Sequence, residues 1–396
     1  MFQRETYLEL LKSFRDKQLI KVVTGIRRCG KSTMYELFCD YLKSTGVSDA
    51  QIIAINFEKH DYSEIRTSNQ LYDFVAERLL PDRMNYVFLD EVQKVEQFQA
   101  ACDALYVKEN VDLYITGSNA KILSGELATL LSGRYVEIKM LPLSFREYVD
   151  ALGDRTDLTR KYREYIEYGS FPYILELSGK KAKNIYLEGI YDSVILKDVV
   201  ARKKIADVAM LENVIRFMFD NIGNPVSATK IANTLTSSGS KISVATVENY
   251  LKALEESFII YKAERYDIKG KQYLATGGKY YVADIGLRYY LLGTKKADRG
   301  HILENVVYLE LLRRGYEVYV GKIGTAEVDF IAIGEEGTEY YQVAYSVDDD
   351  AVLERELAPL ESIADHNAKY LLTMDDEPLT SHNGIKQINV LDWLLK

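Results

Sequence analysis

The sequence is poor in the residues that build metal centres and disulfide networks. It has three cysteines in 396 residues, and the spacing of Cys29, Cys39 and Cys102 fits neither a metal site nor a set of disulfides. The four histidines are scattered along the chain, so we expect no zinc site. This cysteine usage is typical of a reducing compartment, and we expect a cytoplasmic protein.

Long apolar runs are also missing. No run reaches the length of a membrane span, and residues 1–15 carry too many charges for a signal peptide, so we expect no membrane association. Hydrophobic residues make up 47% of the chain and charged residues 28%, as in ordinary globular proteins. Because 396 residues exceed what one hydrophobic core usually holds, we expect two or three domains.

The net charge of −9 is unevenly distributed. It is −4 over residues 1–178, with 23 basic and 27 acidic residues, and −12 over residues 301–396, with 7 and 19. Residues 179–300 have a charge of +7, from 20 basic and 13 acidic residues. A nucleic-acid contact is therefore expected in this middle part, although a solvated basic face would explain the same charge.

A complete G-x-x-x-x-G-K-[ST] motif follows a predicted buried strand at residues 19–23 and precedes a predicted helix at 33–42. In this context the backbone N–H groups and the helix dipole bind phosphate. Gly25 and Gly30 permit the turns, Lys31 reaches the β- and γ-phosphates, and the Ser32 hydroxyl holds Mg²⁺. The predicted nucleotide-binding residues are Gly25, Ile26, Arg27, Arg28, Cys29, Gly30, Lys31, Ser32 and Thr33.

Two carboxylates end a later apolar strand. A second strand is expected at residues 51–57, and a further one at 86–89 ends in Asp90 and Glu91. Since the carboxyl ends of parallel strands gather at one edge of a sheet, both acids should lie beside the phosphate loop. Asp90 would bind the Mg²⁺ shell, and Glu91 would orient and polarise the attacking water.

Polar residues also follow the strand predicted at residues 111–115. Thr116, Ser118 and Asn119 would lie beside the γ-phosphate, where one of them could sense it, and we take Asn119 as a candidate catalytic residue. Ser118 and Asn119 are equally suited to cap the helix predicted at residues 120–131. Both roles remain open. A strand at 135–138 completes this part of the chain.

Four stretches, at residues 25–32, 90–91, 116–119 and 131–134, together resemble the AAA+ ATPase superfamily. Six sequence blocks resemble more closely an abundant group of prokaryotic ATPases. In that group the patterns GxRRxGKS, LDEVQ, TGSN, LSGR, LPLSFxEY and GxFP recur in this order. Here they begin at Gly25, Leu89, Thr116, Leu131, Leu141 and Gly169. The resemblance implies an α/β fold with a P-loop AAA+ parallel sheet and a helical lid, followed by a winged helix and an α/β restriction-endonuclease-like domain.

By that resemblance Arg134 occupies the position of an arginine finger, presented to the nucleotide of a neighbouring subunit. A structural salt bridge is the alternative role for this residue. We find no clear second-sensor arginine in the following helices. An active site shared between subunits would make hydrolysis depend on assembly, so we expect a homo-oligomer, in the form of a ring or another assembly.

The middle of the chain predicts a helical lid at residues 143–205 and a winged helix at 206–285. Helices are expected at 211–221, 228–235 and 244–257, followed by a two-stranded ribbon at 258–266 and 279–282. The third helix and the ribbon would contact DNA through Asn249, Lys252, Lys262, Lys269 and Lys271. A winged helix used only for packing is the alternative, which Glu248, Glu255 and Glu256 favour.

The C-terminal part, residues 286–396, predicts a helix at 303–312 and strands at 317–321, 327–332 and 340–345. This order resembles the PD-(D/E)xK nuclease fold, which the ATPase group above usually carries. Glu304, Asp329 and Gln342 match its carboxylate or amide positions, whereas Ala344 stands where that fold has a lysine. Without the lysine and the third acid, we expect a degenerate nuclease site.

The sequence as a whole therefore predicts an ATPase core at residues 1–142 that uses ATP and Mg²⁺, followed by the three smaller domains. We expect a DNA-binding or remodelling machine that acts on double-stranded or branched DNA. The alternative is a nucleotide-dependent switch that recruits an unknown protein partner through its C-terminal domain. A minority interpretation is an ATP-coupled nuclease.

Overall fold

Strand β1 (Ile20–Thr24), every residue of which is buried, lies between two neighbours in a five-stranded sheet. The other strands are β2 (Ile52–Asn56), β3 (Asn85–Asp90), β4 (Val111–Gly117) and β5 (Tyr135–Lys139). Their order is β2-β3-β4-β1-β5, and every neighbouring pair is parallel. The predicted parallel α/β sheet is therefore confirmed.

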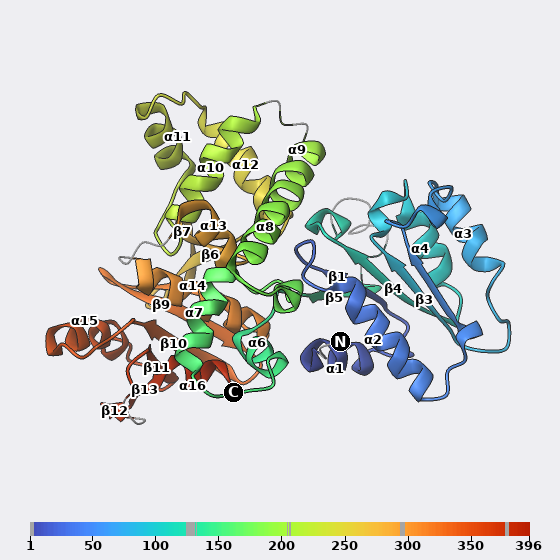
Figure 1. Cartoon of the computed structure of the whole chain (residues 1–396). Helices are drawn as coiled ribbons and strands as arrows, with labels where there is room; N and C mark the ends of the chain where they lie inside the picture. Colours follow the sequence, from blue (N-terminus) through green and yellow to red (C-terminus); the bar gives the residue numbers. More distant parts are fainter. Residues whose placement is uncertain are drawn as a thin grey trace. The chain divides into compact units, whose positions relative to one another are not determined.

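This computed structural model describes residues 4–123, 131, 133–203, 205, 207–293, 298–376 and 380–396 (Figure 1). The chain divides into two compact units. The first holds the chain up to Leu141 together with Glu256–Phe258, and the second holds Pro142–Glu255 and Ile259–Lys396. Among the described residues, no helix has the length and apolar character needed to cross a bilayer.

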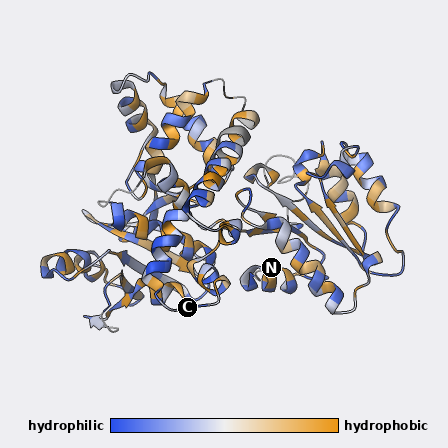
Figure 2. Cartoon of the chain, viewed as in Figure 1, coloured by the Kyte–Doolittle hydropathy of each residue, from blue (hydrophilic) through white to orange (hydrophobic). Residues whose placement is uncertain are grey.

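Helices cover both faces of the first sheet. They are α1 (Glu5–Ser13), α2 (Lys31–Ser44), α3 (Ser68–Ala76) and α4 (Phe98–Tyr106), with short 3₁₀ turns η1 (Asp49–Gln51), η2 (His60–Tyr62), η3 (Val92–Lys94) and η4 (Ala120–Leu123). On one face Phe88 and Tyr114 stack at 4.7 Å and meet Phe38 of α2. The alternate residues of β3 and β4 pack with α3 and α4, so the strands are apolar on both sides (Figure 2).

The helix predicted at residues 120–131 is only partly described. Residues 120–123 form the 3₁₀ turn η4, in which the Ile122 N–H donates to the Asn119 carbonyl, 3.1 Å away. The rest of that predicted helix, from 124 to 130, lies outside the described residues.

The second unit contains the helices predicted at residues 211–221, 228–235, 244–257 and 303–312, together with others that the sequence did not single out. They are α6 (Phe145–Ala151), α7 (Leu158–Tyr168), η5 (Pro172–Glu176), α8 (Lys180–Ile190), the π-helix η6 (Tyr191–Lys197), α9 (Asp198–Lys203), α10 (Val208–Asp220), α11 (Ala228–Ser237), α12 (Val244–Glu256), α13 (Ile285–Leu292), α14 (Arg299–Arg313), α15 (Asp350–Glu361) and α16 (Val390–Leu394). Local capping explains several helix starts, since Ser144 and Glu147 form a capping box and Ser227 caps α11.

A mixed sheet of eight strands forms the rest of the second unit. Its strands are β6 (Ile260–Asp267), β7 (Gln272–Val282), β8 (Glu317–Ile323), β9 (Ala326–Gly334), β10 (Gly337–Val343), β11 (Ala368–Thr373), β12 (Thr380–His382) and β13 (Ile385–Asn389). Their order is β12-β13-β11-β10-β9-β8-β6-β7. The strands predicted at 317–321, 327–332 and 340–345 are β8, β9 and β10, with slightly different ends.

The ribbon that we predicted as the wing of a separate module differs from that prediction. β7 begins at Gln272, seven residues before the predicted strand, and β6 pairs in parallel with β8, with Arg265 opposite Val320. The ribbon is therefore the edge of the eight-stranded sheet and not a free wing. Aromatic contacts account for this placement, because the rings of Tyr266 and Tyr273 pack on Tyr319 of β8 at 6.1 and 5.2 Å.

The Gly-Ser-Phe-Pro turn is held by a buried carboxylate. Asp284, which caps α13, accepts hydrogen bonds from the N–H and hydroxyl of Ser170 as well as from the N–H of Leu287. Gly169 has φ of +84°, and a Cβ there would lie 2.4 Å from an Asp284 oxygen. A Cβ on Gly286 would lie 2.3 Å from the Gly169 nitrogen. The turn and the start of α13 thus approach so closely that each requires glycine.

Substituting Gly286 with alanine should therefore destabilise the second unit. We expect Gly286→Ala to cost about 1–3 kcal/mol, because the new methyl group overlaps the backbone of Gly169. The matched control is Gly189→Ala in α8, where a Cβ would have no neighbouring atom within 4 Å and helix propensity favours alanine by up to about 1 kcal/mol. Urea unfolding followed by the fluorescence of the single tryptophan, Trp393, reports on this unit. Equal midpoints for the two variants would contradict the prediction.

Candidate nucleotide-binding site

The phosphate loop joins β1 to α2 in a tight turn. Gly30 has φ of +104° and precedes the first residue of α2, Lys31. Gly25 has φ of +147°, and a Cβ there would lie 2.1 Å from the carbonyl oxygen of Met140, at the end of β5. Both glycines are therefore required by the backbone, as the sequence predicts. The loop ends at a helix N-terminus, where anions are stabilised.

Lys31 is a buried cation at the base of this loop. Only 4% of the residue is exposed, and its ammonium donates to the carbonyl oxygens of Gly25 and Ile26 at 3.0 and 3.3 Å. Its Nζ lies 3.6 Å from Oε1 of Glu91. The lysine and the glutamate predicted to act on the γ-phosphate therefore lie together.

The Asp90 carboxylate accepts hydrogen bonds from side chains of three other elements. The donors are the hydroxyls of Ser32 and Thr116 and, at 2.6 Å, the amide of Asn56. Burial raises the pKa of Asp90, and the bonds from Ser32 and Thr116 oppose that shift. A hydroxyl and a carboxylate in contact are oxygen donors of the kind Mg²⁺ prefers, so the residues present fit this ion.

Glu91 adopts a backbone conformation that is uncommon for a non-glycine residue. Its φ is +56°, and its N–H donates to the Thr116 hydroxyl at 2.8 Å. Oε2 accepts hydrogen bonds from the amide of Gln93 and, at 3.0 Å, from the hydroxyl of Ser118. Burial raises the pKa of Glu91, but the charge of Lys31 and these two bonds outweigh it and hold the pKa below the usual value. The carboxylate is therefore ionised and fixed in direction at neutral pH.

Three residues of this site were not predicted from the sequence. Gln93 belongs to the LDEVQ pattern, but no role was assigned to it, and its Oε1 is buried without a hydrogen-bond partner among the described residues. Asn56 ends β2, and Arg4 donates to the carbonyl oxygens of Cys29 and Leu141 at 3.0 and 2.8 Å. The position of Asn56 at a strand end could have indicated its role. No local pattern indicates Arg4, because its partners lie 25 and 137 residues away.

The other predicted loop residues have separate contacts. Arg27 pairs with Glu58, Arg28 is exposed with φ of +68°, and Thr33 is half-buried in α2. Cys29 is fully buried, and burial raises the pKa of its thiol, which keeps it uncharged and favours a packing role. Asn119 is 7% exposed at the end of β4, one residue after Ser118.

Arg134 lies at the opposite end of the sheet from the loop. It immediately precedes β5, and its carbonyl accepts a hydrogen bond from Ile20 at the start of β1. The register of β1 and β5 runs from Ile20 to Thr24, a span of about 13 Å. Within the chain its guanidinium pairs with Asp103 and lies 5.4 Å from the ring centre of Tyr106. The two residues predicted to act together, Glu91 and Arg134, are thus not brought together in one chain.

The predicted DNA-contacting residues are all at least partly exposed. Asn249 and Lys252 lie on the exposed side of α12, while Lys262, Lys269 and Lys271 lie along β6 and in the turn after it. Tyr273, which the sequence did not single out, is 60% exposed directly after that turn.

The three predicted residues of the C-terminal site are brought together, with an unexpected fourth. Glu304 and Asp329 both approach Lys279 of β7, whose Nζ is 2.8 and 3.5 Å from their oxygens. Gln342 accepts a hydrogen bond from the Asp329 N–H at 3.3 Å. Among the described residues, however, no group of three or more histidine, cysteine, aspartate or glutamate side chains could hold a metal ion.

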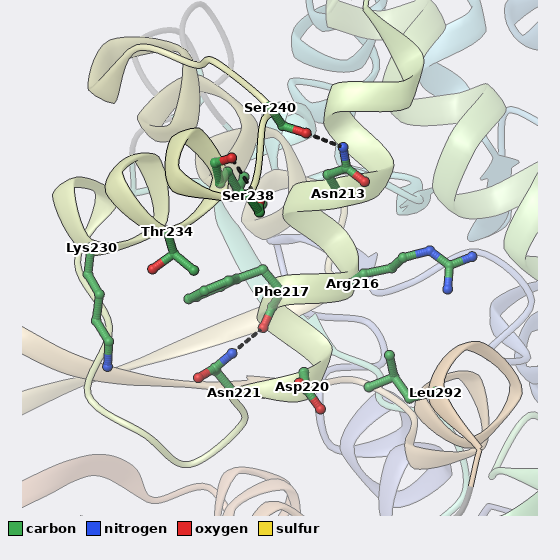
Figure 3. Close-up of a pocket in the computed structure, with 11 residues that line it drawn as sticks. Asn213, Arg216, Phe217, Asp220, Asn221, Lys230, Thr234, Ser238, Ser240 and Leu292 are labelled. Atoms are coloured by element: carbon green, nitrogen blue, oxygen red, sulfur yellow. Dashed lines mark hydrogen bonds between the residues drawn. The ribbon is translucent and has the colours of Figure 1, made fainter.

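The second unit also has a cavity of about 680 Å³ beside α10 and α11 (Figure 3). Its apolar lining includes Phe217, Leu235 and Leu292, and Asn213 donates to Ser240 across one end at 3.3 Å. Arg216 extends away from α11 and donates to the Leu291 carbonyl. None of the predicted site residues lines this cavity.

The strand order β2-β3-β4-β1-β5, with a phosphate loop after β1 and two acids at the end of β3, defines a P-loop ATPase fold of the AAA type. Comparisons with known proteins agree. A family model for an AAA domain matches residues 17–149, and one for a domain of unknown function (DUF8612) matches residues 159–298. A Walker-type ATPase of Pyrococcus abyssi is 15% identical, with a TM-score of 0.51 over 74% of this chain and 96% of that one. This likeness shows the fold alone.

Two relatives match this chain over almost its whole length. An uncharacterized protein of Haemophilus influenzae is 42% identical over 100% of this chain and 99% of its own length. An uncharacterized protein of Methanocaldococcus jannaschii is 29% identical over 94% of this chain and 85% of that protein. The chain belongs to the same family as the Haemophilus influenzae protein, a family with an AAA-type P-loop ATPase domain. The second match, to residues 159–298, crosses the boundaries we predicted at 205 and 285, and the domain limits in the second unit remain predictions.

Removing the Gln93 side chain should slow ATP turnover without loss of nucleotide binding. Gln93 donates a hydrogen bond to the Glu91 carboxylate and fixes its direction, and a misdirected base can lower the rate up to about 100-fold. We expect Gln93→Ala to lower kcat and to leave the affinity for a fluorescent ATP analogue unchanged. Gln99→Ala, on α4, is the matched control and should keep full activity. Normal turnover of Gln93→Ala would show that the hydrogen bond has no role in catalysis.

Proposed function

We propose that this protein hydrolyses ATP with Mg²⁺, works as a homo-oligomer and uses the cycle to act on DNA. The observation that supports hydrolysis most directly is the Glu91 carboxylate, ionised and fixed by Ser118 and Gln93, 3.6 Å from the buried Lys31 ammonium. A nucleotide-binding loop alone would not need an oriented base beside it. The pair supplies both a cation for the phosphate charge and a base for water.

In this proposal each residue has a defined role. The loop N–H groups and Lys31 bind the β- and γ-phosphates, and Ser32 and Asp90 hold Mg²⁺, which when bound neutralises charge that develops on the phosphoryl oxygens. Glu91 accepts a hydrogen bond from the attacking water and polarises it. Gln93 keeps the carboxylate in place, and its buried Oε1 is available to accept a second hydrogen bond from that water. Thr116 and Ser118 fix the two acids, and Asn119 is the proposed γ-phosphate sensor.

Arg134 is proposed to act on the site of a neighbouring subunit. It lies at the strand end opposite its own loop, so it can reach a phosphate only across an interface. Its present partner, Asp103, is 38% exposed and the arginine itself 42%, so exchange of this surface ion pair for a phosphate costs little. A guanidinium presented in this way stabilises the charge of the transition state.

Mixing two inactive variants tests this arrangement. Glu91→Gln should lower turnover by about 10² to 10⁴ and Arg134→Ala by about 10³ or more, with ATP still bound. In a mixed assembly, some sites combine the intact Glu91 of one chain with the intact Arg134 of another. We therefore expect turnover in the mixture well above the sum of the separate variants, and rising with protein concentration.

ATP turnover should not recover in the mixture of Glu91→Gln and Arg134→Ala if Arg134 only forms its salt bridge with Asp103. Mixing Glu91→Gln with Lys31→Ala is the matched control, because both changes fall in the half of the site that one chain supplies, so no site in that mixture is complete. No gain in the Arg134→Ala mixture, together with turnover independent of protein concentration, would exclude a site shared between subunits.

The proposal of DNA contact is supported by charge and exposure in the second unit. Residues 179–300 carry a charge of +7, and the turn after β6 presents Lys269 and Lys271 to solvent. Exposed Tyr273 follows, so the same turn offers cations for phosphates and an aromatic face. Asn249 and Lys252 add polar groups on α12.

Charge reversal at the turn tests the DNA role. We expect the double variant Lys269→Glu, Lys271→Glu to bind linear and branched duplex DNA at least about tenfold more weakly, with a shallower dependence on salt. The matched control reverses Lys17 and Lys43, two exposed lysines of the first unit. ATP turnover measured with and without DNA would show whether binding is coupled to hydrolysis. DNA binding that is unchanged by the turn variant would contradict the proposed contact.

A nucleotide-dependent switch that recruits a protein is the second candidate. It is favoured by a partly apolar surface in the second unit, where Tyr173 and Ile185 are each 57% exposed and the Tyr173 ring lies 5.4 Å from that of Tyr186. If neither DNA form binds at low salt or changes ATP turnover, this candidate replaces the first.

A further inference from the structure

Lys279 of β7 is a buried lysine surrounded by acids. Only 4% of the residue is exposed, and its Nζ lies 2.8 Å from Glu304 Oε1, 3.0 Å from Glu327 Oε1 and 3.5 Å from Asp329 Oδ1. The four side chains come from three elements, β7, α14 and β9. An ammonium group has three hydrogens, and here each has a carboxylate within reach.

Two of these acids, Glu304 and Asp329, also accept hydrogen bonds from other parts of the fold. Glu304 also accepts a hydrogen bond from the Tyr281 hydroxyl at 2.5 Å, and Tyr281 stacks on Tyr308 with ring centres 4.2 Å apart. The second oxygen of Asp329 accepts from the Val343 N–H at 3.0 Å. Glu304 and Asp329 are therefore held beside the lysine by contacts on more than one side.

Gln342, the third predicted ligand, is also engaged. Its Oε1 accepts from the Asp329 N–H, and its Nε2 donates to Glu356 at 2.9 Å. Its carbonyl oxygen thus serves the backbone of β9. The amide therefore links the backbone of Asp329 to the carboxylate of Glu356.

The lysine supplies one positive charge against the three carboxyl groups of the cluster. Burial lowers the pKa of Lys279, but the charges of Glu304, Asp329 and Glu327 outweigh this and raise it above its usual value, so the ammonium persists. Burial and the neighbouring Glu304 raise the pKa of Asp329 to about 7, against the opposing charge of Lys279. Without the lysine, several acids would be buried together with nothing to offset their repulsion.

The residues present do not fit a metal ion. Mg²⁺ requires near-octahedral coordination at about 2.0–2.1 Å, and the centre of this cluster is filled by Nζ. The lysine expected two residues after Gln342 is replaced by Ala344, so a lysine is present in the cluster but reaches it from a different strand.

We infer that the Lys279 ammonium takes the place of a divalent cation between Glu304 and Asp329, and so closes the C-terminal site to metal binding and to metal-dependent cleavage of phosphodiesters. The same contacts fasten the β6–β7 ribbon to α14 and β9. The cluster therefore also has a structural role, because one positive charge from the edge strand holds together acids from the centre of the domain.

Removal of the lysine tests the inference directly. In the absence of nucleotide, Lys279→Ala should melt on the order of 10 °C below the wild type, because it leaves buried acids unpaired. Millimolar Mn²⁺ should restore part of this loss, and Tb³⁺ luminescence sensitised by the nearby tyrosines should rise several-fold over the wild type. Both gains should disappear in Lys279→Ala, Asp329→Asn. Lys386→Ala, an exposed lysine on β13 of the same sheet and outside the cluster, is the matched control and should behave as the wild type.

A second measurement uses only well-folded protein. Full-length wild type and Asp329→Asn are titrated with Mn²⁺ by calorimetry without nucleotide, and both are incubated with duplex DNA and Mg²⁺ or Mn²⁺. We expect identical heats and intact DNA. An Mn²⁺ site that Asp329→Asn removes, or cleavage that depends on Asp329, would overturn the inference, as would a folded Lys279→Ala protein that shows no metal-dependent gain.

Discussion

Parallel pairing of β1, β3 and β4 is the constraint on which the ATPase site depends. Since all three strands run in the same direction, their carboxyl ends bring together the phosphate loop, the two acids and the polar residues after β4. The hydrogen bonds from Thr116 to Asp90 and from Ser118 to Glu91 join neighbouring strand ends directly. The burial of β1 and the alternating apolar residues of β3 and β4 keep these strands in register. The packing of the core therefore also determines the geometry of the site.

Much of this unit could be predicted from the sequence because its signals are local. The glycines of the loop, the apolar strand before Asp90 and the polar residues after β4 each specify a strand end within a few residues. The fold then brings them together by a general rule of parallel sheets. What the sequence could not specify was the direction of the side chains, since Glu91 is fixed by Gln93 and by a left-handed backbone, neither of which a spacing pattern reveals.

Local sequence patterns predict less of the second unit. The helices α10, α11, α12 and α14 and the strands β8, β9 and β10 were predicted from periodicity, whereas α13 and every element after β10 were not. The ribbon was assigned to a separate module because nothing local indicates that β6 pairs with β8. Arg4 and Lys279 were missed for the same reason. Arg4 acts on a carbonyl 137 residues away, and Lys279 pairs with acids 25 and 50 residues further along the chain. Long-range polar contacts of this kind have no periodicity, and only the fold shows them.

The placement of β6 has a mechanical consequence. The chain leaves α12 at Glu256 and enters β6 at Ile260, so a force that pulls on α12 along the chain acts parallel to β6. This strand pairs with β7 from its first residue and also with β8 at residues 265–267. Strands loaded in this direction resist in shear, since their hydrogen bonds lie across the line of force and must break together. Helix α12 is therefore connected directly to a strand of the eight-stranded sheet, and a force applied to this helix is distributed over the second unit.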